Sequence, residues 1–220
     1  MTPKPMSESN NQVLKSLEAR RALAFTIAGV VFAADLVILL FNYSAGTENQ
    51  FMDLGQALIG SAWALGFLGL LGFYPTLSER SRWLARIGGL FSVLGCIAMV
   101  VMAAISFSEF AGLLGGGYEA YVPLFLPGIV LGIILGFGSV GVATLKSRTY
   151  TRMIGLFFLL LVSTFLFNIG TGIAGVLPYL GKVIGVVTVL VVANLALGYL
   201  LWTGRAEPAA TDTSAPDPAA

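Results

Sequence analysis

A single carboxylate, Asp35, interrupts the first long apolar segment of the chain, residues 22–43. It lies about eight residues, or roughly 12 Å along a helix, before the end of that segment. If the segment crosses a membrane, such a carboxylate is costly and is by default a candidate functional group. The alternative is a structural role, in which Asp35 pairs with Lys182 or is protonated and bonded to a neighbouring hydroxyl or amide. Both interpretations stay open.

Other polar side chains lie at a similar or shallower depth in the apolar segments that follow. With Asp35 at the floor, they would line a cavity that opens to the outer side. The predicted intramembrane polar site consists of Asp35, Gln56, Asp53, Asn168 and Lys182, with Asn42 and Thr171 at a similar level. A water-accessible cavity that reaches Asp35 would favour transport, whereas a dry Asp35 paired with one neighbour would favour a structural role.

The residue types that most enzymes need are missing or badly placed. The chain has no histidine, which argues against bis-histidine haem, most membrane zinc sites and serine–histidine catalysis. Gly136, Gly138 and Gly141 have the spacing of a dinucleotide-binding loop, but they lie in an apolar segment that no strand precedes. The sequence therefore predicts a protein that is not an enzyme, with no catalytic residue, no metal and no cofactor.

Composition and charge spacing define the elements that must position these residues. The chain is 57% hydrophobic and only 10% charged, with a mean hydropathy of +0.89, whereas soluble domains are about one-quarter charged. Uncharged apolar stretches long enough to cross a bilayer, about 20 residues each, separate the charges. The sequence predicts an all-α, polytopic membrane protein with six transmembrane helices near residues 22–43, 54–74, 87–107, 120–145, 153–174 and 182–203.

The basic residues predict the orientation. Eleven of the twelve Lys and Arg residues precede the first span, lie in the second and fourth loops or at their edges, or follow the last span, and only Lys182 lies on the other side. By the positive-inside rule, both termini are cytoplasmic in a multi-pass protein of the cell membrane. The predicted organisation is a cytoplasmic segment (1–21), a transmembrane domain (22–204) and a disordered cytoplasmic tail (205–220), with residues 1–12 also disordered.

A spacing of 66 residues recurs along the chain. It links Arg20 with Arg86 and Arg152, and the same step connects the columns Phe25–Phe91–Phe157, Leu58–Leu124–Leu190, Gly66–Gly132–Gly198 and Gly72–Gly138–Gly204. Because 66 residues hold two spans, the pattern predicts three similar helical hairpins, at about 20–85, 86–151 and 152–204. Whether they form a pseudo-threefold ring or another arrangement stays open.

Glycines give this repeat a predicted packing role. Small residues four apart allow helix backbones to approach closely in lipid. The fourth span carries such a stripe, and the even-numbered spans have glycines towards their predicted cytoplasmic ends. The predicted helix-packing residues are Gly66, Gly72, Gly128, Gly132, Gly136, Gly138 and Gly198. Packing within one chain is the favoured interpretation, and a dimerisation face is the alternative.

One stretch suggests a relationship. Residues 68–86, LGLLGFYPTLSERSRWLAR, and the tail rich in Ala, Asp, Pro and Thr resemble small uncharacterised multi-span membrane proteins of halophilic archaea. The likeness covers about a tenth of the chain. The resemblance implies a small multi-span membrane protein and brings no activity and no site residue with it.

Three hypotheses about function follow. The first is a non-enzymatic structural or accessory bundle that acts through a membrane-protein partner or a homo-oligomer in the lipid bilayer. The second is a small transporter or channel with an outward-facing polar cavity around Asp35. The third, an enzyme acting on lipid, would need Asp35 to work with Asp53 or Lys182. Nothing in the chain predicts binding to nucleic acid.

Overall fold

The described chain is helical throughout. The computed structural model describes residues 6–45, 52–114, 118–147, 150–174 and 179–204, and within these ranges the regular elements are all helices. In chain order they are α1 (Met6–Ala45), α2 (Met52–Leu71), α3 (Tyr74–Arg80), α4 (Arg82–Phe110), η1 (Tyr118–Tyr121), α5 (Val122–Leu131), η2 (Gly132–Phe137), α6 (Gly138–Ser147), α7 (Arg152–Ala174) and α8 (Tyr179–Trp202). The predicted cytoplasmic tail, 205–220, lies outside the described residues.

The prediction of six membrane-spanning helices is confirmed by helix length and composition. Six described segments are long and apolar enough to cross a bilayer: Ser16–Asn42, Met52–Leu71, Arg82–Phe110, Val122–Ser147, Arg152–Thr171 and Gly181–Trp202. They match the predicted spans within a few residues at most ends. Helices satisfy every backbone hydrogen bond inside one segment, which the hydrocarbon core of a membrane requires.

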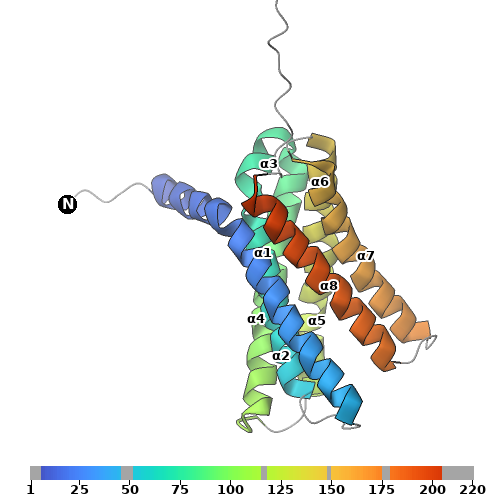
Figure 1. Ribbon diagram of the computed structural model, residues 1–220. Helices are drawn as coiled ribbons and strands as arrows, with labels where there is room; N and C mark the ends of the chain where they lie inside the picture. Colours follow the sequence, from blue (N-terminus) through green and yellow to red (C-terminus); the bar gives the residue numbers. More distant parts are fainter. Residues whose placement is uncertain (1–5, 46–51, 115–117, 148–149, 175–178, 205–220) are drawn as a thin grey trace, which may run out of the picture.

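Helix α1 is longer than the sequence suggested. It begins at Met6 and runs without interruption to Ala45, so the prediction of disorder is wrong for residues 6–12. An apolar span supplies the helix nucleus, and adding a polar residue to an existing helix costs little. In Figure 1 the first turns of α1 lean away from the rest of the bundle.

By their contacts, the spans follow one another around the bundle in chain order. Helix α1 packs between α2 and α8, α4 lies between α2 and the fourth span, and α7 contacts α6 and α8. Consecutive hairpins would produce this order. The three-hairpin repeat itself stays a prediction, and its columns differ in environment, since Leu124 is 72% exposed and Leu190 only 4%.

Aromatic rings fill the middle of the bundle. Phe137 from η2 lies 5.1 Å from Phe67 of α2 and 5.9 Å from Phe158 of α7, measured between ring centres. Trp63 of α2 contacts the edge of Phe137 at 5.5 Å. Rings at these separations and tilts attract one another beyond their apolar burial. The aromatic cluster therefore joins the second, fourth and fifth spans.

The fourth span is not one continuous α-helix. Pro127 lies inside α5, and residues 132–137 form a π-helix between α5 and α6. A π-helical turn is wider than an α-helical turn, so the residues on its two sides face other directions than in a continuous α-helix. The wider turn places Phe137 in the aromatic centre.

Glycines of the fourth span contact α4 along a stripe. A Cβ atom added at Gly132 would lie 2.5 Å from Gly95 Cα, one at Gly128 would lie 2.8 Å from Ala98 Cβ, and one at Gly136 would lie 3.3 Å from Ser92 Oγ. These approaches leave no room for a larger residue at Gly132. Small residues on both helices therefore set the distance between α4 and the fourth span.

The other predicted packing glycines divide into two groups. Gly198 faces Thr26 of α1, Gly66 faces Phe137 at 3.5 Å, and Gly72 faces the Leu17 carbonyl at 2.8 Å, each measured from an added Cβ. A Cβ added at Gly138 would lie within 4 Å of no atom of another described helix. Gly138 follows Gly136 by two residues, roughly half a helical turn, and therefore lies away from the stripe on α4.

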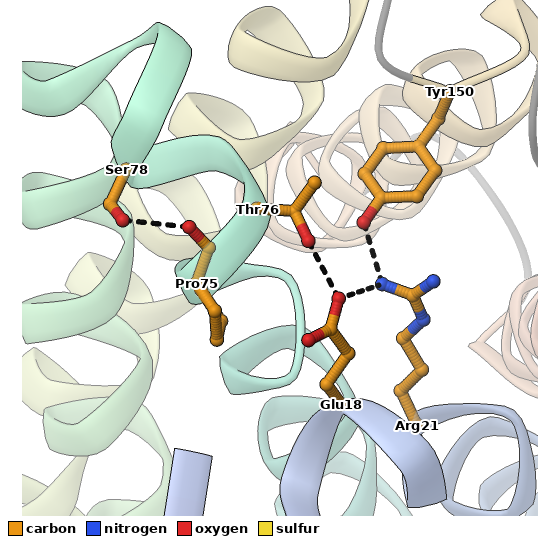
Figure 2. Close-up of polar contacts among 6 residues, drawn as sticks. All are labelled: Glu18, Arg21, Pro75, Thr76, Ser78 and Tyr150. Carbon is orange, nitrogen blue, oxygen red and sulfur yellow. Dashed lines mark hydrogen bonds and ion pairs between the residues drawn. The ribbon is translucent and has the colours of Figure 1, made fainter. Parts of the chain in front are cut away.

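A polar cluster ties together the end of the bundle that carries α3, here called the α3 end (Figure 2). The Arg21 Nη1 atom donates to Tyr150 Oη at 2.6 Å and lies 3.6 Å from Glu18 Oε1. Thr76 Oγ1 donates to the same Glu18 oxygen at 2.6 Å. The Arg21 guanidinium also lies over the Phe73 ring, 4.8 Å from its centre. This Arg21 cluster connects α1 with α3 and with the segment before α7.

Two alanine substitutions in the fourth span test the glycine packing. We expect Gly132→Ala to lower the free energy of unfolding by about 1–3 kcal/mol, because the added methyl group would press against the α4 backbone. Gly138→Ala should be neutral or slightly stabilising, since alanine favours a helix more than glycine does. Circular dichroism of the purified proteins during thermal unfolding in detergent measures both, and equal losses would contradict this packing.

Three substitutions test the Arg21 cluster. We expect Arg21→Gln to cost about 1.5–3 kcal/mol of unfolding free energy, because it removes the charge from the hydrogen bond and from the ring contact. Tyr150→Phe keeps the ring and should cost about 1 kcal/mol. Arg20→Gln changes an exposed neighbour and should stay within about 0.5 kcal/mol. Chemical denaturation of the detergent-solubilised protein ranks the three, and a loss in Arg20→Gln as large as in Arg21→Gln would count against the cluster.

Candidate functional site

Asp35 is completely buried, on α1, against the start of α2. A Cβ added at Gly55, in the first turn of α2, would lie 3.0 Å from Asp35 Oδ1. Neither carboxylate oxygen has a hydrogen-bond partner among the described residues. Asp35 therefore does not form the predicted ion pair with Lys182, nor the predicted hydrogen bond to a described hydroxyl or amide.

The position of Asp35 has an electrostatic explanation. The first N–H groups of a helix have no partner within the helix, and the aligned peptide dipoles place partial positive charge at that end. Gly55 belongs to the first turn of α2, which begins at Met52. The carboxyl group thus lies at the one end of α2 that favours negative charge.

More unsatisfied oxygen atoms lie at the end of the bundle opposite α3, here called the far end. Asn42 follows Asp35 by two helical turns on the same face of α1, is 7% exposed, and its Oδ1 has no described partner. Ser106 and Glu109 of α4 also have buried oxygens without described partners. These oxygens belong to α1 and α4, the two helices that pack against α2.

A cavity of about 240 Å³ lies in the far half of the bundle. Five helices contribute to its wall: α2, α4, α5, α7 and α8. Apolar and aromatic side chains predominate, including Trp63, Met99, Met102, Ile129, Phe165 and Leu190. Methionine and aromatic side chains adapt to irregular apolar shapes, so the wall suits an apolar guest.

The residues of the predicted polar site do not lie together: some line the cavity and others do not. Gln56 and Asn168 line it, as the sequence suggested, but Asp35 is not a lining residue. Lys182 Nζ donates to the Asn168 backbone carbonyl at 3.3 Å, which ties α8 to α7. Asp53 is half-buried in the first turn of α2 and does not line the cavity. The expected polar cavity with Asp35 at its floor is therefore an apolar cavity with two amides, beside a separate buried carboxylate.

Sequence reasoning did not find the residues that form most of the wall. Trp63, Met99, Met102 and Phe165 are apolar residues inside spans, and in a membrane chain such residues can face lipid, a neighbouring helix or a cavity. A tryptophan in mid-span, away from the interfaces where it is enriched, was the one available signal. The described residues include no group of three or more potential metal ligands.

Comparisons with protein families, with curated proteins and with solved structures found no match to this chain. The resemblance of residues 68–86 to small archaeal membrane proteins therefore stays a prediction.

Proposed function

We propose that the protein is a non-enzymatic integral membrane protein, an accessory helix bundle that works by binding an apolar molecule between its spans. The cavity in the far half carries this proposal. Ligand sites are typically apolar and aromatic concavities with a few polar groups that orient the guest. Gln56 and Asn168 are the amide groups in this wall, and their N–H and C=O groups can orient a ligand that has a polar end.

The size of the cavity limits the ligand. An apolar cavity of about 150 Å³ holds benzene, so 240 Å³ accommodates a somewhat larger hydrocarbon group. Water is a poor occupant of its deep part, because a buried water needs two to four polar partners and Trp63, Ile129 and Leu190 supply almost none. An apolar guest would restore the dispersion contacts that an empty cavity lacks.

Filling the cavity tests this function. Val187 of α8 is buried and lines the cavity, whereas Val192 of the same helix is 58% exposed. We expect the wild-type protein, extracted from its native membrane, to retain an apolar molecule that native mass spectrometry detects. Val187→Phe should lose it, because the larger ring occupies the space, and Val192→Phe should keep it. Wild-type protein without any bound mass, or a bound mass unaffected by Val187→Phe, would reject the proposal.

The orientation of the bundle in the membrane is part of the same proposal. The α3 end carries Arg20, Arg80, Arg82 and Lys146, all exposed, and the positive-inside rule favours this end as the cytoplasmic side of the cell membrane. The cavity then lies in the outer leaflet. Labelling of single cysteines from either side of sealed vesicles tests this arrangement.

A small proton- or cation-coupled transporter is the second candidate, and one observation favours it. Asp35 is fully buried with both oxygens unpartnered, and such a carboxyl group is costly unless a proton or cation accompanies it. Asn42 lies on the same face of α1 towards the far end, which supplies a polar step between Asp35 and the outer side.

Replacing the carboxyl group with an isosteric amide tests the second candidate. If the protein transports, Asp35→Asn should abolish proton- or cation-driven flux in proteoliposomes, because the amide cannot exchange a proton or balance a cation. Asp53→Asn, at the half-buried start of α2, is the matched control and should retain most of the flux. Unfolding midpoints show whether both variants keep the fold. Equal flux in Asp35→Asn and wild type would exclude a role for this carboxyl group.

A further inference from the structure

The wall of the cavity is incomplete on the side where the fourth and fifth spans separate. Helix α7 packs against α6 and η2, whereas α5 packs against α4 and η2. Figure 1 shows α7 and α8 inclined away from the α2, α4 and α5 group towards the far end. Leu126 of α5 lines the cavity and is also 44% exposed. The cavity wall is therefore continuous with the surface that faces lipid.

We propose that the cavity holds the end of one hydrocarbon chain of a membrane lipid, which enters sideways between α5 and α7. This inference rests on the proposed function, because it names the apolar molecule that the cavity binds. In a chain with six spans, the phase next to Leu126 is the hydrocarbon of the bilayer. Lipid chains are the most concentrated apolar molecules there, and they reach the opening without crossing water.

The depth of the cavity fits a chain that enters from one leaflet. Gln56 and Trp63 mark its far and deep ends on α2, seven residues and about 10 Å apart along the helix. One leaflet contributes roughly 15 Å of hydrocarbon to the bilayer core. A single chain is therefore long enough to place its terminal methyl group near Trp63 while its first carbons stay outside the cavity.

The amides stand at the end where a lipid becomes polar. Gln56 and Asn168 lie nearer the far end than Trp63, Phe165 and Leu190 do, and each amide carries two N–H donors. Ester or ether oxygens of a lipid are acceptors, so they match these donors. In the deep part, the chain makes dispersion contacts with the wall that an empty cavity would lack.

Tryptophan fluorescence tests the proposal directly, because bromine quenches a tryptophan that it contacts. Trp63 is 5% exposed and lines the cavity, whereas Trp83 and Trp202 are 76% and 73% exposed at the α3 end. The protein with Trp63 alone, made by Trp83→Phe and Trp202→Phe, is reconstituted in vesicles of phosphatidylcholine with and without brominated chains. We expect a clear loss of Trp63 emission in the brominated vesicles.

Cavity-filling variants separate a chain inside the cavity from lipid outside the bundle. Val187→Phe should restore most of the Trp63 emission, and Val192→Phe, on the lipid-facing side of α8, should leave the quenching unchanged. Val183→Phe fills the same cavity near its far end. It is the replacement variant if Val187→Phe does not fold. A protein with Trp83 alone should be quenched in every background.

The outcomes distinguish this inference from the function on which it rests. Unquenched Trp63 beside quenched Trp83 would overturn the lipid-chain proposal, as would quenching that neither Val187→Phe nor Val183→Phe relieves. If native mass spectrometry then still finds a cavity-dependent mass that is not a lipid, the proposed binding function survives with another apolar ligand. If no such mass is found, both fail.

Discussion

Gly95 and Gly132 bring α4 and the fourth span so close that an added methyl group would lie 2.5 Å from the opposite backbone. Lipid offers helices no hydrophobic reason to associate, so such close packing must supply the attraction. Gly198 of α8 approaches Thr26 of α1 closely in the same way, which holds these two helices together. The order of the spans, the aromatic centre and the position of the cavity all depend on these approaches, because they decide which helix pairs are tight.

The cavity occurs where this close packing ends. The fourth span contacts α4 along its glycine stripe, whereas α7 packs mainly on α6 and η2, in the later part of that span. The π-helical turn at residues 132–137 lies at that transition and turns the two halves of the span in different directions. The same span thus packs closely on one neighbour and leaves free space beside another, and the residues that line the resulting cavity include no charged one.

Asp35 is the exception to this apolar interior. It has no hydrogen-bond partner among the described residues, yet it lies at the helix end whose dipole favours a carboxylate. The glycine at position 55 leaves the room that its oxygen occupies. The helix dipole lowers the free-energy cost of burying the carboxylate, and a bound proton or cation would neutralise its charge. The Arg21 cluster shows the contrasting case, in which each charge has a described partner.

The sequence by itself determined the class of protein, because uncharged apolar runs of about 20 residues permit little besides membrane helices. It also identified Gly132, Gly128 and Gly136, because a four-residue spacing keeps small side chains on one helix face. The tertiary structure alone decided that Gly138 lies off that face, that Asp35 and the cavity are separate, and that Trp63 and Met99 line the cavity. Apolar residues look alike in a membrane sequence whether they face lipid, a helix or a void. Only the rotation of each helix, set by glycine contacts and the π-helical turn, distinguishes these three.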